Sequence, residues 1–168
     1  MATANDLERA ERVERLLRRC EDEHSLLEGE RRPGFALFLQ VDGEPPLIAC
    51  RGVEDIETGK PIDPDTQFRI ASLTKQFTCA VVLMLERNGL LSLDDGIAKY
   101  LPELRFDGQS ITLRHLCWNT SGIRDYFALS TLSGMTVFGG LRQAKIWDLI
   151  TRQRGLNFPP GSQERYSN

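Results

Sequence analysis

Two side chains three residues apart, Ser72 and Lys75, have the clearest chemical potential in the sequence. A serine hydroxyl is a weak nucleophile until a base removes its proton. Residues three positions apart share a face of a helix, so the Lys75 amine can reach the Ser72 hydroxyl. Lysine acts as a base only when neutral, which requires burial or a nearby cation. Free backbone N–H groups at a helix N-terminus can also stabilise an oxyanion. The spacing therefore indicates nucleophilic catalysis by serine.

A second pair, Tyr166 and Asn168, lies far along the chain. A phenol beside a lysine ammonium has a lowered pKa. It can then shuttle a proton between a nucleophile and a leaving group. The Asn168 amide can orient the lysine and hold a substrate carbonyl. The two pairs together predict an acyl-transfer site, provided that the fold brings them into contact.

Each pair also has an ordinary structural interpretation. A chain of this length contains about one Ser-x-x-Lys by chance. Ser72 can simply cap a helix while Lys75 is solvated, and Tyr-x-Asn is common in surface turns. The sequence offers few metal ligands, because the chain has only two histidines and its four cysteines are scattered without a C-x-x-C pair. We therefore expect no metal site.

Longer stretches around both pairs resemble a known family, the serine β-lactamase and penicillin-binding-protein superfamily. Its branch of class C β-lactamases, esterases and D-stereospecific peptidases is the most similar. The resemblance spans residues 34–168 and rests on these stretches: 63–75 (DPDTQFRIASLTK), 89–95 (GLLSLDD), 100–102 (YLP), 120–126 (TSGIRDY), and 158–161 (FPPG) leading into 166–168 (YSN).

The resemblance implies a role for each residue of the two pairs. Ser72 would be the acylated nucleophile, Lys75 its proton partner, and Tyr166 the general base or proton shuttle. Asn168 would contact the substrate. Whether Lys75 or Tyr166 takes the first proton stays open. The backbone N–H of Ser72 would supply half of the oxyanion hole.

The implied fold is β-lactamase-like, an α/β fold of the α+β type. It combines an antiparallel sheet with covering helices and an all-helical part. The implied reaction is acyl transfer through an acyl-Ser72 ester that water then hydrolyses, on an ester, amide or β-lactam bond. This chemistry needs no metal and no organic cofactor.

The sequence departs from the family pattern in two places. Asn119 precedes Thr-Ser-Gly where the family usually has histidine. Asparagine can still donate and accept, so we expect altered loop anchoring without loss of chemistry. The chain also ends before the family's third motif, a Lys or His followed by Ser or Thr and Gly on a late strand. We interpret it as the N-terminal portion of a serine hydrolase, or a truncated product. A non-catalytic binding module and an incomplete fragment are the alternatives to an active hydrolase.

The N-terminal third of the chain combines a helix with a hairpin. Apolar residues recur at three- and four-residue steps over 5–29, which predicts a helix capped by Asn5, with His24 packed on its apolar stripe. Strands over 35–41 and 47–53, joined by the turn 42–46, predict a β-hairpin. The first strand is apolar enough for burial on both faces. A lone hairpin is marginal in water, and no later strand is visible to complete the sheet.

Helices dominate the rest of the sequence. We predict helices over about 72–88, 93–100, 111–116 and 141–152, the third of them capped by Thr112. We divide the chain into an N-terminal helix (1–33), a sheet hairpin with its loop (34–71), and a helical part that carries both motifs (72–168). Together these would form one truncated β-lactamase-like domain.

Composition limits the function classes. The 168 residues are 40% hydrophobic and 27% charged, which excludes wholesale disorder. The net charge of −3 argues against a nucleic-acid partner. No apolar run approaches the ~20 residues of a membrane span, and the first residues lack the apolar core of a secretory signal. We therefore expect a cytoplasmic protein with a small-molecule ester, amide or β-lactam substrate and no membrane partner. An esterase, or a D-amino-acid peptidase or amidase, fits this setting better than a periplasmic β-lactamase. The oligomeric state stays open.

Overall fold

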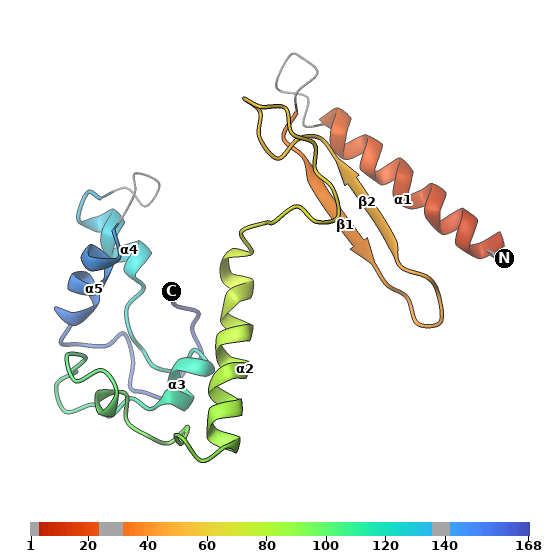
Figure 1. The fold of residues 1–168 in the computed structure, drawn as a ribbon. Helices are drawn as coiled ribbons and strands as arrows, with labels where there is room; N and C mark the ends of the chain where they lie inside the picture. Colours follow the sequence, from red (N-terminus) through yellow and green to blue (C-terminus); the bar gives the residue numbers. More distant parts are fainter. Residues whose placement is uncertain (1–3, 24–31, 136–141) are drawn as a thin grey trace. The chain divides into compact units, whose positions relative to one another are not determined.

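The computed structural model describes residues 4–23, 32–135 and 142–168. The chain separates into two compact units, residues 1–69 and 70–168, which are described here in turn. Figure 1 labels the elements: α1 (Ala4–Glu23), β1 (Phe35–Leu39), β2 (Leu47–Arg51), α2 (Thr74–Arg87), α3 (Leu113–Cys117), α4 (Tyr126–Leu132) and α5 (Gln143–Thr151). Short 3-10 helices occupy Ala71–Leu73 and Ile97–Lys99.

The first unit is an antiparallel hairpin with one helix beside it (Figure 1). β1 and β2 pair in a register that sets Phe35 opposite Arg51 and Leu39 opposite Leu47. The hairpin prediction is confirmed, with each strand two residues shorter than expected. Burial on both faces is not observed, because Phe38 is 64% and Ile48 52% exposed.

Helix α1 lies along the hairpin and supplies the buried side chain of Leu17. Glu14 ties the helix to the end of β2 through a 2.6 Å hydrogen bond from Arg51. The described helix ends at Glu23. His24 and the rest of the predicted helix to residue 29 lie outside the described residues, and nothing is described of the Asn5 side chain.

The second unit forms around a small apolar core of Ile97, Leu104, Phe106 and Ile111. α2 begins one 3-10 turn after residue 70 and ends at Arg87 with Asn88 as its cap, within one residue of the predicted end at about 88. Gly89 takes a positive φ of 70°, the left-handed conformation that terminates many helices.

The predicted α-helix over 93–100 is wrong, since only Ile97–Lys99 is helical there, as a 3-10 turn. Part of the backbone of this segment bonds to a neighbouring segment instead of continuing an α-helix. Ile97 N–H donates to the Ile111 carbonyl at 2.8 Å, and Gly96 forms a bridge with Thr112. The Asp95 carboxylate accepts from Ser92 N–H and organises the turn.

The later helices agree better with the prediction. α3 begins after Thr112, whose hydroxyl accepts from His115 N–H as a cap. α5 falls within the predicted 141–152 range. α4 was not predicted, and Asp125 caps it by accepting from the N–H groups of Phe127 and Ala128. Among the described residues, no helix is long and apolar enough to cross a membrane.

Candidate active site

Ser72 and Lys75 meet where α2 begins. Ser72 lies in the 3-10 turn Ala71–Leu73, and Lys75 lies in the first turn of α2. This arrangement places Lys75 Nζ 3.2 Å from Ser72 Oγ. Ala71, just before the serine, has a φ of 46°. A non-glycine residue in this left-handed region stores strain, a feature that clusters at functional sites.

Tyr166 comes to this pair from the segment that follows α5. Its phenolic oxygen shares a 2.6 Å hydrogen bond with Ser72 Oγ. Lys75 Nζ donates to the same phenolic oxygen at 2.8 Å and lies over the tyrosine ring. The hydrogen bond from Lys75, and then the one with Ser72, lower the pKa of Tyr166 below its ordinary value. This direction is the one that the sequence predicted for a phenol beside an ammonium.

Asn168 completes the cluster. Its Oδ1 accepts from Lys75 Nζ at 3.2 Å and lies 3.3 Å from the Tyr166 phenolic oxygen. The fold thus brings together all four residues that the sequence singled out, from positions more than 90 apart in the chain. Ser72, Tyr166 and Asn168 are exposed, so a substrate can approach them from solvent.

The turn after α3 holds the Tyr166 segment in place. The Asn119 carbonyl accepts from Arg165 N–H at 2.9 Å, and Asn119 Oδ1 accepts from Ser167 N–H at 3.4 Å. The Gly122 carbonyl accepts from Asn157 N–H at 2.8 Å, and Gly161 N–H donates to the Thr120 carbonyl at 2.8 Å. Asparagine in place of the expected histidine therefore anchors the loop, with its backbone in the left-handed region at a φ of 54°.

Asp125 is the residue of this cluster that the sequence did not reveal. Its Oδ2 accepts from both the backbone N–H and the side-chain Nδ2 of Asn168, each at 2.7 Å. Burial alone would raise the pKa of this carboxyl, but the hydrogen bonds from Asn168, Ala128 and Phe127 lower it below its ordinary value. A carboxylate three residues after Thr-Ser-Gly, just before an apolar run, was the available signal for a helix cap.

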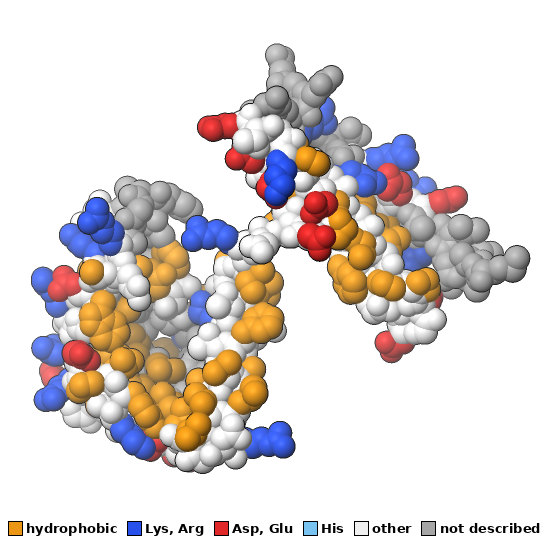
Figure 2. Space-filling model, in the orientation of Figure 1, with side chains coloured by type: hydrophobic (Ala, Val, Ile, Leu, Met, Phe, Trp, Pro, Cys, Tyr) orange, Lys and Arg blue, Asp and Glu red, His pale blue; other side chains and the backbone are white. Residues whose placement is uncertain are grey.

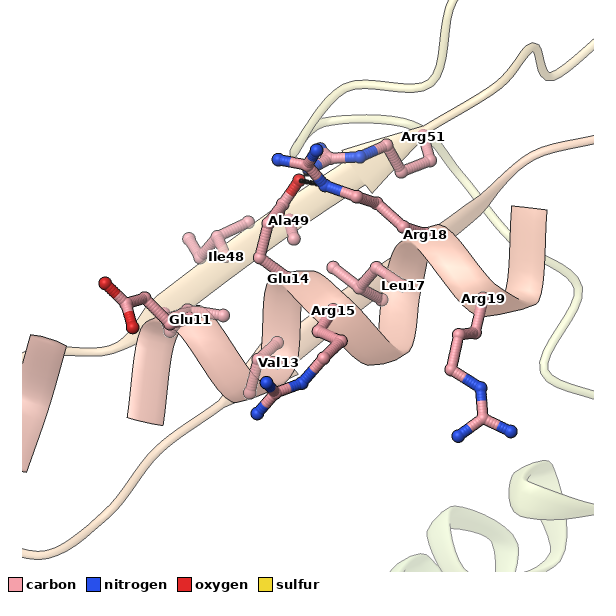
Figure 3. A pocket seen from close by; sticks show the side chains of 11 residues that line it. Glu11, Val13, Glu14, Arg15, Leu17, Arg18, Arg19, Ile48, Ala49 and Arg51 are labelled. Carbon is pink, nitrogen blue, oxygen red and sulfur yellow. Dashed lines mark hydrogen bonds and ion pairs between the residues drawn. The ribbon is translucent and has the colours of Figure 1, made fainter. Parts of the chain in front are cut away.

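The other candidate features of the chain are weaker candidates for a catalytic or binding site. Figure 3 shows a hollow between α1 and β2, whose Glu14 carboxylate is already paired with Arg51 and Arg18. Cys79 Sγ contacts the Cys117 carbonyl at 4.0 Å, and burial is the first cause that raises the pKa of Cys117, to about 11. The raised pKa of Cys117 leaves its thiol protonated and a poor nucleophile. No group of three or more His, Cys, Asp or Glu side chains in the described part of the chain could hold a metal ion.

The family model described as Beta-lactamase matches residues 13–168. The chain belongs to the Beta-lactamase family. The match includes both pairs of site residues, and it confirms the resemblance on which their roles were predicted.

Proteins similar to this chain include enzymes named for D-amino-acid substrates. A D-aminopeptidase of Brucella anthropi is 39% identical over 136 residues, which cover 81% of this chain and 26% of that protein. D-amino acid amidase from Ochrobactrum anthropi SV3, solved with L-phenylalanine, has a TM-score of 0.60 at 28% identity over 80% of this chain and 36% of that one. EstCE1, a hydrolase with promiscuous acyltransferase activity, has a TM-score of 0.74 at 26% identity over 98% of this chain and 45% of that one.

These likenesses confirm the predicted fold class. The structure comprises part of the β-lactamase fold, with helices and a two-stranded antiparallel sheet. The chain spans about a quarter of the length of the curated relatives it matches.

Proposed function

We propose that this chain carries the nucleophile site of a serine hydrolase, which acts through an acyl-Ser72 intermediate. One observation carries the proposal: Ser72 Oγ, Lys75 Nζ and the Tyr166 phenolic oxygen lie within 3.2 Å of one another. A nucleophile in hydrogen-bond contact with a base that a third group orients is the arrangement that nucleophilic catalysis requires.

The geometry favours Tyr166 as the first proton acceptor. Its oxygen is closer to Ser72 Oγ than Lys75 Nζ is, at 2.6 against 3.2 Å. The hydrogen bond from Lys75 lowers the pKa of Tyr166 and so increases the fraction present as phenolate. In the first step, Ser72 Oγ bonds to the substrate carbonyl carbon while its proton passes to the phenolate oxygen.

The second half of the reaction regenerates the enzyme. When the tetrahedral intermediate collapses, the bond to the leaving group breaks and the Tyr166 phenol returns the proton to it. The Tyr166 phenolate then takes a proton from water, and the hydroxide attacks the acyl-Ser72 ester. When this second tetrahedral intermediate collapses, the acid is released and the bond to Ser72 Oγ breaks. The Tyr166 phenol gives its proton to Ser72 Oγ, which restores both the Ser72 hydroxyl and the Tyr166 phenolate. The hydrogen bond from Lys75 Nζ to the phenolic oxygen stabilises the phenolate form of Tyr166. These proton transfers use no metal and no organic cofactor.

The substrate class follows from the bond type and the relatives. An acyl-serine route suits ester, amide and β-lactam bonds of small molecules. The D-aminopeptidase and D-amino acid amidase names favour amides and peptides of D-amino acids among these. A short D-amino-acid amide is therefore the first substrate to test for the whole protein.

The cellular setting remains a separate proposal. Its support is the cysteine pattern of the sequence, because scattered cysteines without a C-x-x-C pair suit a reducing compartment. We infer a cytoplasmic location, without a nucleic-acid or membrane partner. Fractionation of the native host, with detection of the protein in the cytosolic fraction, tests this location.

Intact-protein mass spectrometry tests the nucleophile. The chain is incubated separately with a nitrophenyl ester and with a penicillin, beside Ser72→Ala. We expect one acyl adduct per chain, absent in Ser72→Ala and retained in Ser133→Ala. Ser133→Ala removes an exposed hydroxyl that donates to the Ser130 carbonyl and lies outside the Ser72 cluster. An unlabelled wild-type chain with an intact fold would refute the proposal that this chain acts by itself.

A second candidate is a β-lactamase-fold fragment or binding module without catalysis. The observation that favours it is α2, which has no buried residue. A helix with an apolar face needs a covering layer to be stable. Unfolding of this chain without a cooperative transition would support the fragment, whereas ligand binding that survives Ser72→Ala would support the binding module.

A further inference from the structure

We propose that Asp125 is a positioning residue that holds the Asn168 side chain and aims its Oδ1 at Lys75 Nζ. This inference rests on the proposed function, because it assigns to Asp125 a task in the same acyl-transfer site. Asp125 would touch neither the substrate nor the reacting atoms. It would act through Asn168 on the ammonium that lies beside both Ser72 and Tyr166.

The hydrogen bonds that the Asp125 carboxylate accepts on both of its oxygens fix its orientation. Oδ1 accepts from Phe127 N–H at 2.7 Å and from Ala128 N–H at 3.1 Å, which caps α4. Oδ2 accepts from Asn168 N–H and from Asn168 Nδ2, both at 2.7 Å. The rigid end of a helix therefore holds the carboxylate, and the carboxylate in turn holds both the backbone and the side chain of Asn168.

The carboxylate also decides which way the Asn168 amide faces. An ionised carboxylate only accepts hydrogen bonds, so the NH₂ side of the amide must face Asp125. The amide oxygen is then left on the opposite side, 3.2 Å from Lys75 Nζ. A reversed amide would set two acceptors against each other at Asp125 and two donors against each other at Lys75. Asp125 thereby places an acceptor beside the ammonium.

Two variants separate this task from the capping of α4. Serine and asparagine are both good N-cap residues, so Asp125→Ser and Asp125→Asn keep the cap. Asp125→Ser is too short to reach Asn168. Asp125→Asn, with its oxygen on the cap, presents donors to the donors of Asn168. Asp148→Asn is the charge-matched control, because that exposed carboxylate pairs with Arg152 and lies outside the cluster.

The experiment combines two readouts on the full chain. The first is the rate of Ser72 acylation by a nitrophenyl ester. The second is the NMR spectrum of the unreacted chain, in which the Asn168 side-chain NH₂ signals report the contact with Asp125, and the Phe127 and Ala128 amide signals report the cap. We expect acylation to fall about 10- to 100-fold in both Asp125 variants, as for a misplaced catalytic group. The Asn168 signals should move while the cap signals stay, and Asp148→Asn should behave as wild type.

Each other outcome is decisive. Wild-type acylation rates in both Asp125 variants, or unmoved Asn168 signals, would overturn the positioning role. A loss of the cap signals together with a loss of acylation would also overturn it, since Asp125 would then be only structural. If the wild-type chain is not acylated, the proposed function of this chain fails. In that case the NMR signals of the Asn168 side chain alone would test whether Asp125 orients Asn168.

Discussion

At the scale of single residues, the site is a short network of groups centred on Lys75. Its ammonium donates to Ser72 Oγ, to the Tyr166 phenolic oxygen and to Asn168 Oδ1, at 3.2, 2.8 and 3.2 Å. A cation in this place stabilises a phenolate more than it stabilises a neutral phenol. The contact explains why the pKa of Tyr166 is lowered even though its side chain is exposed.

The pH dependence of Ser72 acylation tests whether Tyr166 is the base and whether Lys75 lowers its pKa. Tyr166 acts as a base only when deprotonated, so the rate should rise with pH and level off below the pH at which an ordinary tyrosine ionises. In Lys75→Met the hydrogen bond that lowers the pKa of Tyr166 is lost. The midpoint of the rate profile should then move to higher pH.

Stopped-flow acylation with a nitrophenyl ester, measured between neutral and alkaline pH, gives the two profiles. Tyr166→Phe is the control. It should lower the rate by about 10²–10⁴-fold, the usual contribution of a general base, and remove the rise with pH. A Lys75→Met midpoint that stays in place or falls would contradict the assignment of Tyr166 as the base.

At the scale of elements, the site depends on close contact between two segments that are not regular structure. Residues 119–122 and 157–168 meet through three backbone hydrogen bonds and a fourth from Ser167 N–H to Asn119 Oδ1, and the second segment ends in Tyr166 and Asn168. Gly122 lies where these segments are closest. It has a φ of 74°, and a Cβ built there would lie 2.2 Å from the Phe158 carbonyl oxygen.

We predict that Gly122→Ala separates the two segments. The left-handed backbone costs an alanine about 1–2 kcal/mol, and the overlap with Phe158 adds about 1–3 kcal/mol. The shift should carry Tyr166 away from Ser72 and lower acylation as well as stability. Urea unfolding and adduct formation measure the two effects.

Gly108→Ala is the matched control for this variant. Gly108 also has a positive φ, 67°, but a Cβ there meets nothing within 4 Å. Gly108→Ala should lose only the stability that the left-handed backbone costs an alanine, and it should keep the wild-type acylation rate. Equal destabilisation in the two variants would show that the contact with Phe158 does not limit the fold.

At the scale of the whole molecule, the main feature is the apolar surface of α2, which is exposed to solvent. Phe77, Val81 and Met84 share one face of the helix and are 61%, 54% and 63% exposed. Figure 2 shows the hydrophobic side chains gathered along this helix. Contiguous apolar surface of this kind marks a place where further polypeptide packs.

We predict that this chain binds a hydrophobic dye through α2. The double variant Phe77→Ser/Met84→Ser should reduce dye fluorescence, and its stability should change by no more than about 0.5 kcal/mol per site, since the side chains are exposed. Leu132→Ser is the control, because Leu132 is 84% exposed but lies on α4. Strong destabilisation by the double variant, without any dye signal, would show that another part of the protein covers this face.

The sequence by itself predicted the catalytic chemistry and determined most of the local structure. Ser72 and Lys75 are neighbours through helical periodicity, so their contact follows from their spacing. The hairpin, α2 with its stop at Gly89, and the cap at Thr112 also follow from short-range patterns. The family resemblance named Tyr166 and Asn168, although nothing in the spacing of the two pairs could bring them together.

Only the tertiary structure decided how the second pair reaches the first. The contacts at Asn119, Gly122 and Asp125 join residues about 35 to 48 positions apart, and such contacts have no periodic signal in a sequence. The segment at Gly96 shows the same limit, since its backbone bonds to residues 111–112 rather than continuing a helix. Local propensity is a weak preference, and a backbone group takes whichever partner the fold supplies.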